Sequence, residues 1–161
     1  GAVWMPYQWM FFKSALDAGL ADFAYRIADT ALTLWQNECA ESYCCFEHFM
    51  IESRRGAGWH QFSGLSSPIV QWFSAYYRPG TLTTGFDAFV RHTDWAPDNS
   101  ALNATLDFTA AGRSTVLAVL QPGPKAVTAS VPCTVVTRHD GLLELTFALD
   151  APCTVTISIH S

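Results

Sequence analysis

The chain has 161 residues, of which 50% are hydrophobic and 14% are charged, and its formal net charge is −5. This length suits one ordinary domain or two small ones, and the apolar fraction is enough for a packed core. The negative charge argues against a protein that neutralises nucleic-acid phosphates, and no apolar run is as long as a membrane-spanning helix. We therefore expect neither nucleic acid nor a membrane as a partner.

Residues 1 to about 78 are predicted to be helical from their hydrophobic periodicity. Trp4–Ala18 is rich in Met, Phe, Trp and Leu, and Gly19 stands where a helix C-cap belongs. Leu20–Trp35 is predicted to be an amphipathic helix, and Gly64–Tyr77 a third helix. The residues expected on the core face of the second helix are Phe23, Ile27, Ala31 and Leu34, and the expected N-cap of the third is Ser66 or Ser67.

The first predicted helix, Trp4–Ala18, is apolar on nearly every face. Such a helix has to be buried on all sides. The chain does not provide enough mass to bury it, so we expect a second polypeptide to cover it. That polypeptide is either a partner chain or a preceding part of the same protein.

The remainder of the chain is predicted to be β-structure. Arg78-Pro79-Gly80 ends the helical half, Thr81–Ser100 is expected to be a connector, and from Ala101 the apolar pattern has a period of two. Short strands separated by turns predict an antiparallel β-sandwich. The predicted strands include Thr105–Phe108, Ser114–Leu120, Val127–Thr137, Leu142–Leu149 and Thr154–Ile159, with turns at Gln121–Pro124 and His139–Gly141.

The five cysteines are odd in number. Cys133 and Cys153 each follow a proline and open a predicted strand, so they either bridge neighbouring strands or are two buried thiols. A bridge would favour a secreted or periplasmic location over the cytoplasm. Cys39, Cys44 and Cys45 lack the spacing of a zinc site and are interpreted as buried thiols, and we expect neither a metal nor another cofactor.

The segment Asn37–Gln61 has no helical period and is dense in aromatic, glycine and charged residues. Long ordered loops in compact domains tend to be functional, and aromatic rings suit sugar binding because pyranose C–H faces stack on them. Gly56-Ala57-Gly58 is expected to let the backbone turn tightly beside a ligand. A carboxylate in such surroundings suits general acid–base catalysis, although composition alone favours a solvated or ion-paired side chain for any one of the four: Glu38, Glu41, Glu47 and Glu52.

Two motifs in this order resemble the C-terminal signature of glycoside hydrolase family 63 and its mannosylglycerate-hydrolase-like bacterial relatives. The first is Gly1-Ala2-Val3-Trp4-Met5-Pro6, and the second joins Glu47-His48-Phe49 to the stretch from Gly56 to Gly64 that contains Phe62-Ser63. The resemblance covers about residues 1–90. It implies a fold in which residues 1–90 are the C-terminal helices of an (α/α)6 barrel with a catalytic loop at 37–63. An antiparallel β-sandwich follows at 91–161.

The family resemblance implies an inverting exo-glycosidase in which one Glu is the general base. That Glu matches Glu47, and Glu41 in Glu41-Ser42-Tyr43 is the second choice because its spacing to Phe62 needs an insertion. The general acid of the family is an Asp that we expect on a second polypeptide, together with the rest of the barrel, so the chain alone should be inactive. The expected substrate-binding residues are Trp4, Gln8, Trp59, His60 and Phe62, of which His60 would bind a sugar hydroxyl or orient Glu47.

Two other functions fit the same residues. A rhamnosidase-like or phosphorylase-like barrel enzyme is one, and a phosphorylase would need a phosphate pocket for which Arg54, Arg55 and His60 are the candidates. A non-catalytic carbohydrate-binding or structural module is the other, in which the aromatic loop is only packed. The sugar, its linkage and its anomeric form are not encoded in recognisable motifs.

Overall fold

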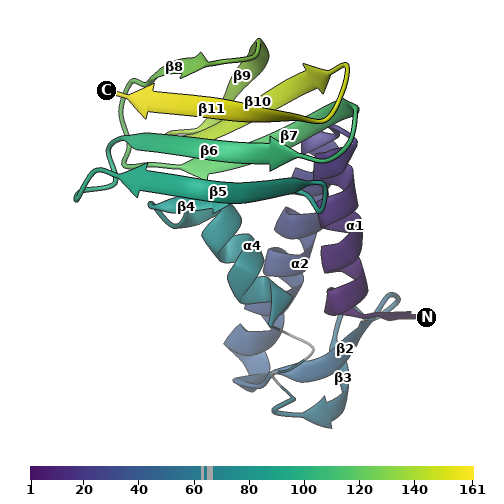
Figure 1. Cartoon of the computed structure of the whole chain (residues 1–161). Coiled ribbons are helices and arrows are strands. Elements are labelled where there is room, and N and C mark those ends of the chain that lie inside the picture. Colours follow the sequence, from purple (N-terminus) through teal and green to yellow (C-terminus); the bar gives the residue numbers. More distant parts are fainter. Residues whose placement is uncertain (63, 65–66) are drawn as a thin grey trace. The chain divides into compact units, whose positions relative to one another are not determined.

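The computed structural model describes residues 1–62, 64 and 67–161. These residues form three helices and eleven strands, and the strands make three antiparallel sheets (Figure 1). The described chain divides into two compact units, one made of Gly1–Phe12 and Asp22–Phe73 and the other of Lys13–Ala21 and Ser74–Ser161. None of the helices described is long and apolar enough to cross a membrane.

The first unit is built around helical segments. They belong to α1 (Met5–Asp17), α2 (Ala21–Ser42) and α4 (Pro68–Tyr77), and the ends of α1 and α4 continue into the second unit. Phe12 and Trp72 are fully buried, and their rings meet edge to face with centroids 6.3 Å apart. Burial of such large rings contributes strongly to the stability of a core.

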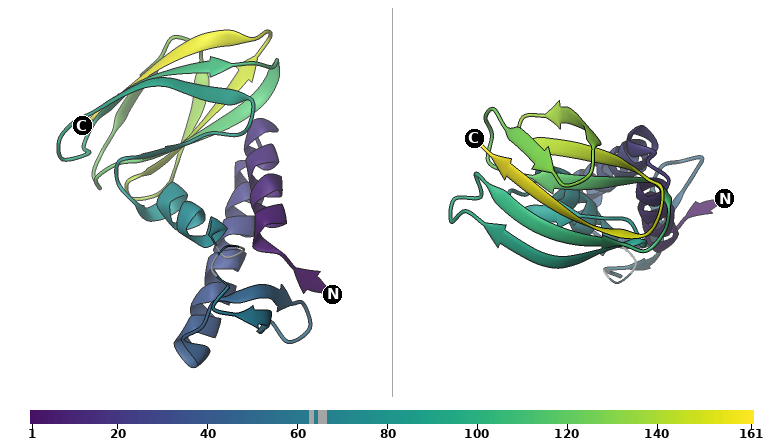
Figure 2. Two further views of the ribbon diagram at one scale, coloured as in Figure 1. Left: turned by 60° about the horizontal axis from the view of Figure 1, so that its bottom comes forward. Right: turned by 45° about the horizontal axis from the view of Figure 1, so that its top comes forward.

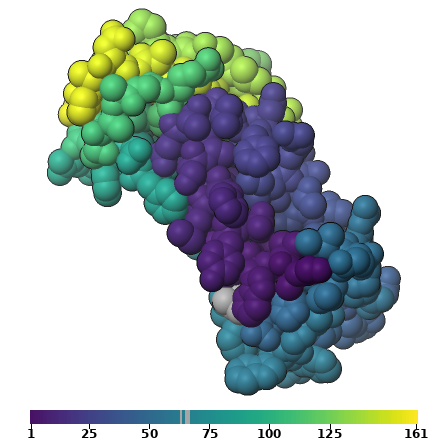
Figure 3. All heavy atoms as spheres, turned by 90° about the vertical axis from the view of Figure 1, so that its right-hand side faces the viewer, coloured from purple at the N-terminus to yellow at the C-terminus, as the bar shows by residue number. Residues whose placement is uncertain are grey.

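A small antiparallel sheet completes the first unit. Its strands are β1 (Ala2–Val3), β2 (Phe46–Met50) and β3 (Gly56–His60), in the order β1-β2-β3. Val3 pairs with Phe49, so the first residues of the chain lie against the hairpin, as the dark purple and blue atoms of Figure 3 show. The prediction of an irregular loop over Asn37–Gln61 is therefore wrong. The segment has no single period because it contains the last turns of α2 and two short strands.

The second unit contains two four-stranded antiparallel sheets that share one hydrophobic core (Figure 2). One sheet has the order β4-β7-β10-β9 and the other β5-β6-β11-β8. Inward residues of both sheets, such as Leu106 and Phe147, are fully buried. The bounds are β4 Thr81–Thr83, β5 Ala88–Trp95, β6 Leu102–Phe108, β7 Gly112–Val119, β8 Ala126–Ala129, β9 Cys133–His139, β10 Leu142–Leu149 and β11 Cys153–His160.

The end of α1 follows the sequence-based expectation. Gly19 has a left-handed φ of 67°, its N–H donates to the carbonyl of Leu16, and the N–H of Leu20 donates to the carbonyl of Ala15. This pair of bonds is the Schellman arrangement that ends many helices, and it confirms Gly19 as the C-cap residue.

The predicted fold class, C-terminal helices of an (α/α)6 barrel followed by an antiparallel β-sandwich, is wrong. The part of the chain that the structure describes holds three helices against eleven strands in three antiparallel sheets, so this is a β-rich molecule and not a set of barrel helices. An (α/α)6 barrel is built from inner and outer helices in pairs. Two segments that were expected to connect such elements, 37–61 and 81–100, form β2 to β5 instead.

The buried faces of α1 and α2 differ from those predicted from the sequence. Of the four residues expected on the core face of α2, Ala31 is buried, whereas Phe23 is exposed. The buried face of α2 consists of small residues, Ala24, Ala28 and Ala31, together with Glu38. On α1 one face is buried and the other is exposed within this chain, and the cover expected from a second polypeptide stays a prediction; the exposed residues are Tyr7, Met10 and Phe11.

All five cysteines are free thiols. Cys133 begins β9 and Cys153 begins β11, and these strands belong to different sheets, so the two residues do not bridge neighbouring strands. The N-cap prediction for the third helix cannot be compared at Ser66, which lies outside the described residues, as does Ser63 of the second motif.

Candidate active site around Glu47

The hairpin of β2 and β3 carries the carboxylate that the sequence favoured. Phe46 pairs with His60, and His48 pairs with Ala57, with a register irregularity between Phe46 and His48. Glu47 lies at this irregularity. A bulge of this kind re-aims side chains and is frequent beside functional sites.

The two glycines of β3 make room for side chains of β2. Gly58 has a left-handed φ of 83°, and a Cβ atom there would lie 2.4 Å from Oε2 of Glu47. A Cβ atom at Gly56 would lie 2.1 Å from Cδ2 of Phe46. We expected these glycines to let the backbone turn tightly beside a ligand, but in the structure they let the hairpin accommodate its own side chains.

The carboxylate of Glu47 makes one hydrogen bond among the described residues. Its Oε2 accepts a hydrogen bond from the backbone N–H of Trp59 at 3.3 Å, and the residue is half-buried. No Lys, Arg or His among residues 1–62, 64 and 67–161 forms an ion pair with it. No hydrogen bond to the other oxygen, Oε1, is found among the described residues.

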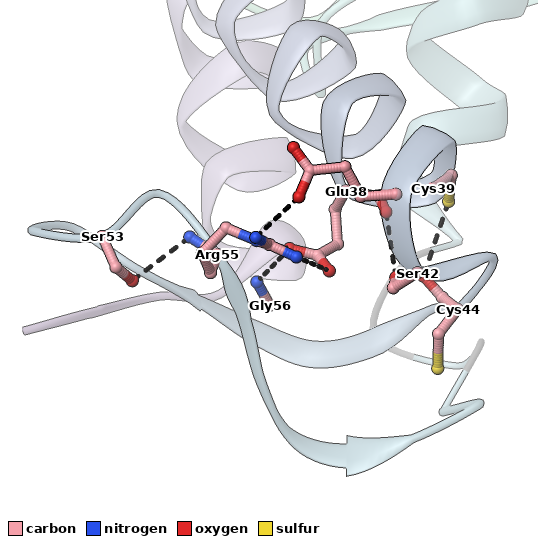
Figure 4. Close-up of polar contacts among 8 residues, drawn as sticks. Glu38, Cys39, Ser42, Cys44, Ser53, Arg55 and Gly56 are labelled. Atoms are coloured by element: carbon pink, nitrogen blue, oxygen red, sulfur yellow. Dashed lines mark hydrogen bonds and ion pairs between the residues drawn. The ribbon is translucent and has the colours of Figure 1, made fainter.

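Glu38 is in the opposite situation, since its side chain is only 2% exposed. Arg55 donates from Nε to Oε2 at 2.8 Å and from Nη2 to Oε1 at 3.1 Å, and the N–H of Gly56 donates to Oε2 at 2.8 Å (Figure 4). The hydrogen bond from Arg55 lowers the pKa of Glu38 to about 2, against the opposing effect of burial. Glu38 thus fastens α2 to the start of β3 and is a structural anion.

The remaining two carboxylates are also ion-paired. Glu41, the second choice for the general base, is on α2, is 64% exposed and lies 2.7 Å from Nη1 of Arg55. Glu52 lies 3.0 Å from the N-terminal amine. Of the four carboxylates singled out from the sequence, Glu47 is the one without a cationic partner among the described residues.

The imidazole ring of His48 lies against the same glycine as the Glu47 carboxylate. A Cβ atom at Gly58 would touch both Glu47 and, at 3.1 Å, Cε1 of His48, so the edge of the His48 ring and the carboxylate meet at this glycine. The His48 ring stacks on Trp4 with centroids 5.1 Å apart. Nδ1 of His48 is buried and has no hydrogen-bond partner in the described part of the chain.

Trp59 and Phe62, which follow Gly58 in the chain, form a second aromatic pair. Their rings meet edge to face with centroids 5.6 Å apart, and Trp59 is 70% exposed. Trp59 is thus largely accessible to solvent. The structure therefore places Trp4, Trp59 and Phe62 on the segments that carry or contact the hairpin of Glu47.

Two predicted binding residues lie in other surroundings. The ring of His60 contacts the edge of Phe46 with centroids 5.1 Å apart, and it makes no hydrogen bond to Glu47 in the residues described. Gln8 lies on α1 and lines a surface hollow of about 500 Å³ with Phe11 and Phe23. Neither residue is brought into contact with the Glu47 carboxylate.

Sequence reasoning missed two contacts of the site. The Glu38–Arg55 ion pair and the Trp4–His48 stack join residues that are far apart in the chain, so no local sequence pattern predicts them. His48 nevertheless belongs to the motif Glu47-His48-Phe49, so the sequence already placed it next to Glu47.

Comparison of the chain with protein-family models, curated proteins and solved structures finds no match. Within the described ranges, no group of three or more His, Cys, Asp or Glu side chains is arranged to hold a metal ion.

Proposed function

We propose that this chain supplies the general-base carboxylate, Glu47, of an inverting exo-glycoside hydrolase. The observation that carries the proposal is the state of the four carboxylates between residues 38 and 52. Glu38, Glu41 and Glu52 are each ion-paired, whereas Glu47 has one oxygen on the N–H of Trp59 and no cation among the residues described. An unpaired, oriented carboxylate is what proton abstraction from water requires.

In this reaction Glu47 removes a proton from a water molecule as the water oxygen attacks the anomeric carbon. The glycosidic oxygen leaves on the opposite face of the sugar and takes a proton from a second carboxyl group. In inverting enzymes the two carboxyl groups stand about 6.5–9.5 Å apart, which leaves room for the water. The bond from Trp59 orients one oxygen of Glu47 and leaves the other to accept the proton.

The second carboxyl group is proposed to come from another polypeptide. The aspartates of the first unit, Asp22 and Asp29, are on α2, and neither is on the hairpin that carries Glu47. Trp4, Trp59 and Phe62 are proposed to contact the sugar through their rings, since the C–H faces of a pyranose pack on aromatic surfaces. The chain alone is then expected to bind sugar without hydrolysing it.

The test is Glu47→Gln in the complete assembly, with Glu41→Gln as the matched control. Because a general base contributes about 10²–10⁴-fold to the rate, kcat on aryl glycosides should fall by that factor for Glu47→Gln, with an unchanged melting temperature. Glu41→Gln should keep kcat within about threefold, since an exposed ion pair contributes little. NMR should show a first-formed sugar of inverted anomeric configuration. Full activity of Glu47→Gln, or a retained configuration, would contradict the proposal.

A second candidate is a non-catalytic carbohydrate-binding module, which the 70% exposure of Trp59 favours. In that case Trp59→Ala should abolish sugar binding in calorimetry while Glu47→Gln has no effect on any turnover. A phosphorylase is less suited to the site, because Arg55 is already engaged by Glu38 and Glu41. Addition of phosphate should therefore leave turnover of aryl glycosides unchanged.

A further inference from the structure

The apolar face that the sequence predicts for α2 is not covered by this chain. Phe23 is exposed, and Ile27 and Leu34 are half-buried. These residues, with Thr30 and Asn37, line two surface hollows of about 500 and 570 Å³. Thr30 and Leu34 belong to both hollows, so the two join into one trough along α2.

The five residues that line the trough have the spacing of a coiled-coil seam. They stand at positions 23, 27, 30, 34 and 37, so the steps alternate between four and three residues. Residues with this period stay on one face of a helix over several turns, and the element that packs on such a seam is another helix. At about 1.5 Å per residue, the seam is about 21 Å long.

The walls of the trough are largely apolar. Met5, Gln8 and Phe11 of α1 line the first hollow, and residues 49–51 at the end of β2 line the second. All of these residues belong to the first unit. An apolar trough of this length suits recognition in which a partner helix lays its apolar face into a groove.

The charged groups of the trough are mainly basic. Arg26 lines the first hollow, and Arg54 and Asp29 line the second. Arg26 directly precedes Ile27 and lies over the Phe23 ring, with 5.6 Å between its guanidinium carbon and the ring centroid. At this position beside a seam, coiled-coil helices form ion pairs with the neighbouring helix, so the complementary residue opposite Arg26 is acidic.

We propose that the trough binds one α-helix of a second polypeptide, with apolar residues at alternating steps of three and four and acidic residues opposite Arg26 and Arg54. Asn37 lies in the seam, and a single polar residue in a seam fixes the register of the two helices. The partner helix therefore places a polar side chain opposite Asn37. The inference does not rest on the function proposed for Glu47, so a glycosidase assay and a test of this binding can fail separately.

A second copy of the chain does not offer such a helix. Beside its own seam, α2 has one carboxylate, Glu38, which is buried and bound by Arg55. The acidic residue of α1, Asp17, accepts the N–H groups of Phe86 and Asp87, and α4 has no acidic residue. The other residues that flank the seam of α2 are neutral or basic, namely Ala24, Arg26, Ala31 and Thr33.

The test uses three labelled synthetic peptides of three heptads each. Two have isoleucine and leucine along the seam with one asparagine, and they differ in the residues beside the seam, which are glutamate in one and lysine in the other. The third has the composition of the glutamate peptide in shuffled order. Fluorescence anisotropy with the whole chain, in salt that screens distant charges, should show saturable binding of the glutamate peptide, weaker binding of the lysine peptide and none of the shuffled peptide.

Matched variants of the chain locate the site. Ile27→Asp and Leu34→Asp place a carboxylate on the seam and should each weaken binding of the glutamate peptide at least tenfold, with circular dichroism to check folding. Arg26→Glu, at an exposed position, should weaken the glutamate peptide and strengthen the lysine peptide by about threefold each. Gln36→Asp, at an exposed position of α2 outside the trough, is the control that should leave binding unchanged.

Four outcomes overturn the proposal. Neither seam peptide binds, or the lysine peptide binds as tightly as the glutamate peptide. Ile27→Asp and Leu34→Asp leave binding unchanged in a folded chain. Sedimentation shows that the chain alone is a dimer which these two substitutions dissociate, in which case the occupant of the trough is a second copy.

Discussion

At the scale of single residues, carboxylates that are close together in the sequence have different surroundings and therefore different roles. Glu38 is buried and takes three hydrogen bonds from Arg55 and Gly56, while Glu47 has one long bond to a backbone N–H. Composition treats the two alike. What distinguishes them is that Arg55 pairs with Glu38, whereas no cation among the described residues pairs with Glu47.

The ion pair of Glu38 gives stability that depends on pH. Its pKa of about 2 in the folded chain lies below the ordinary value of 4.5, so this stability is fully present above about pH 4.5. It is lost as the pH falls from 4.5 through 2, by up to about 3 kcal/mol, because one pKa unit corresponds to about 1.4 kcal/mol. Urea unfolding at several pH values should show this slope in the wild type and a weaker slope in Glu38→Gln.

An equal slope in Glu38→Gln and the wild type would contradict that assignment. Glu52→Gln is the control for the comparison. Its partner is the N-terminal amine at an exposed site, where an ion pair contributes little. Its acid unfolding should match that of the wild type.

The glycine beside Glu47 is the second residue-scale test. Gly58→Ala places a methyl carbon 2.4 Å from Oε2 of Glu47, which must move, and strains a backbone with a φ of 83°. Since a left-handed alanine costs roughly 1–2 kcal/mol, the chain should remain folded. If Glu47 is the base, kcat of the assembly should nevertheless fall at least tenfold. Gly123→Ala, which has a similarly positive φ and only the end of Lys125 nearby, is the control that should leave kcat unchanged.

At the scale of elements, the C-terminal end of α1 holds a loop of the second unit. The carboxylate of Asp17 accepts the backbone N–H of Phe86 at 2.7 Å and of Asp87 at 3.0 Å. Lys13 lies one turn before Asp17 on α1, and its Nζ donates to the carbonyl oxygen of Thr84. Gly85 permits this approach, since a Cβ atom there would lie 1.7 Å from Oδ1 of Asp17.

Asp17→Ala should therefore destabilise the second unit. Hydrogen bonds to a charged group contribute about 1.5–3 kcal/mol each at most, and partial exposure of the loop reduces this, so we expect a loss of roughly 1–3 kcal/mol. The midpoint of urea unfolding is the measurement. Asp150→Ala, at an exposed turn, should leave the midpoint unchanged, and an equal effect of the two substitutions would refute the role of Asp17.

Sequence reasoning located elements well where local chemistry decides them. Leu142–Leu149 was predicted with the bounds that β10 has, and Gly19 ends α1 as expected. Val127–Thr137 was predicted as one strand but divides into β8 and β9, because Pro132 has no N–H to give to a sheet. Thr81–Ser100 was predicted as a connector because its strands are short or bulged, and a bulge in β5 breaks the period of two.

At the scale of the whole molecule, sequence reasoning failed where distant segments decide the outcome. The barrel was inferred from the resemblance of two motifs to a family, yet those motifs contain neither the number of helices nor the pairing of strands. The site was partly predictable: Glu47 and the aromatic residues were named from the sequence, but the ion pairs that Arg55 forms with Glu38 and Glu41 were not. Pairings of this kind arise only when the chain folds.

The exposed apolar side of α1 provides the last prediction, because it separates packing within the chain from association with another polypeptide. Phe11 and Phe12 are adjacent, but Phe11 is 59% exposed and Phe12 is 0% exposed. Phe12→Ser removes a buried ring and should cost at least about 3–5 kcal/mol in urea unfolding, whereas Phe11→Ser should change stability by less than about 0.5 kcal/mol. If a second polypeptide covers α1, Phe11→Ser should weaken the assembly in analytical ultracentrifugation although the chain stays folded. An assembly that is indifferent to Phe11→Ser would mean that this apolar side of α1 faces solvent in the complete protein.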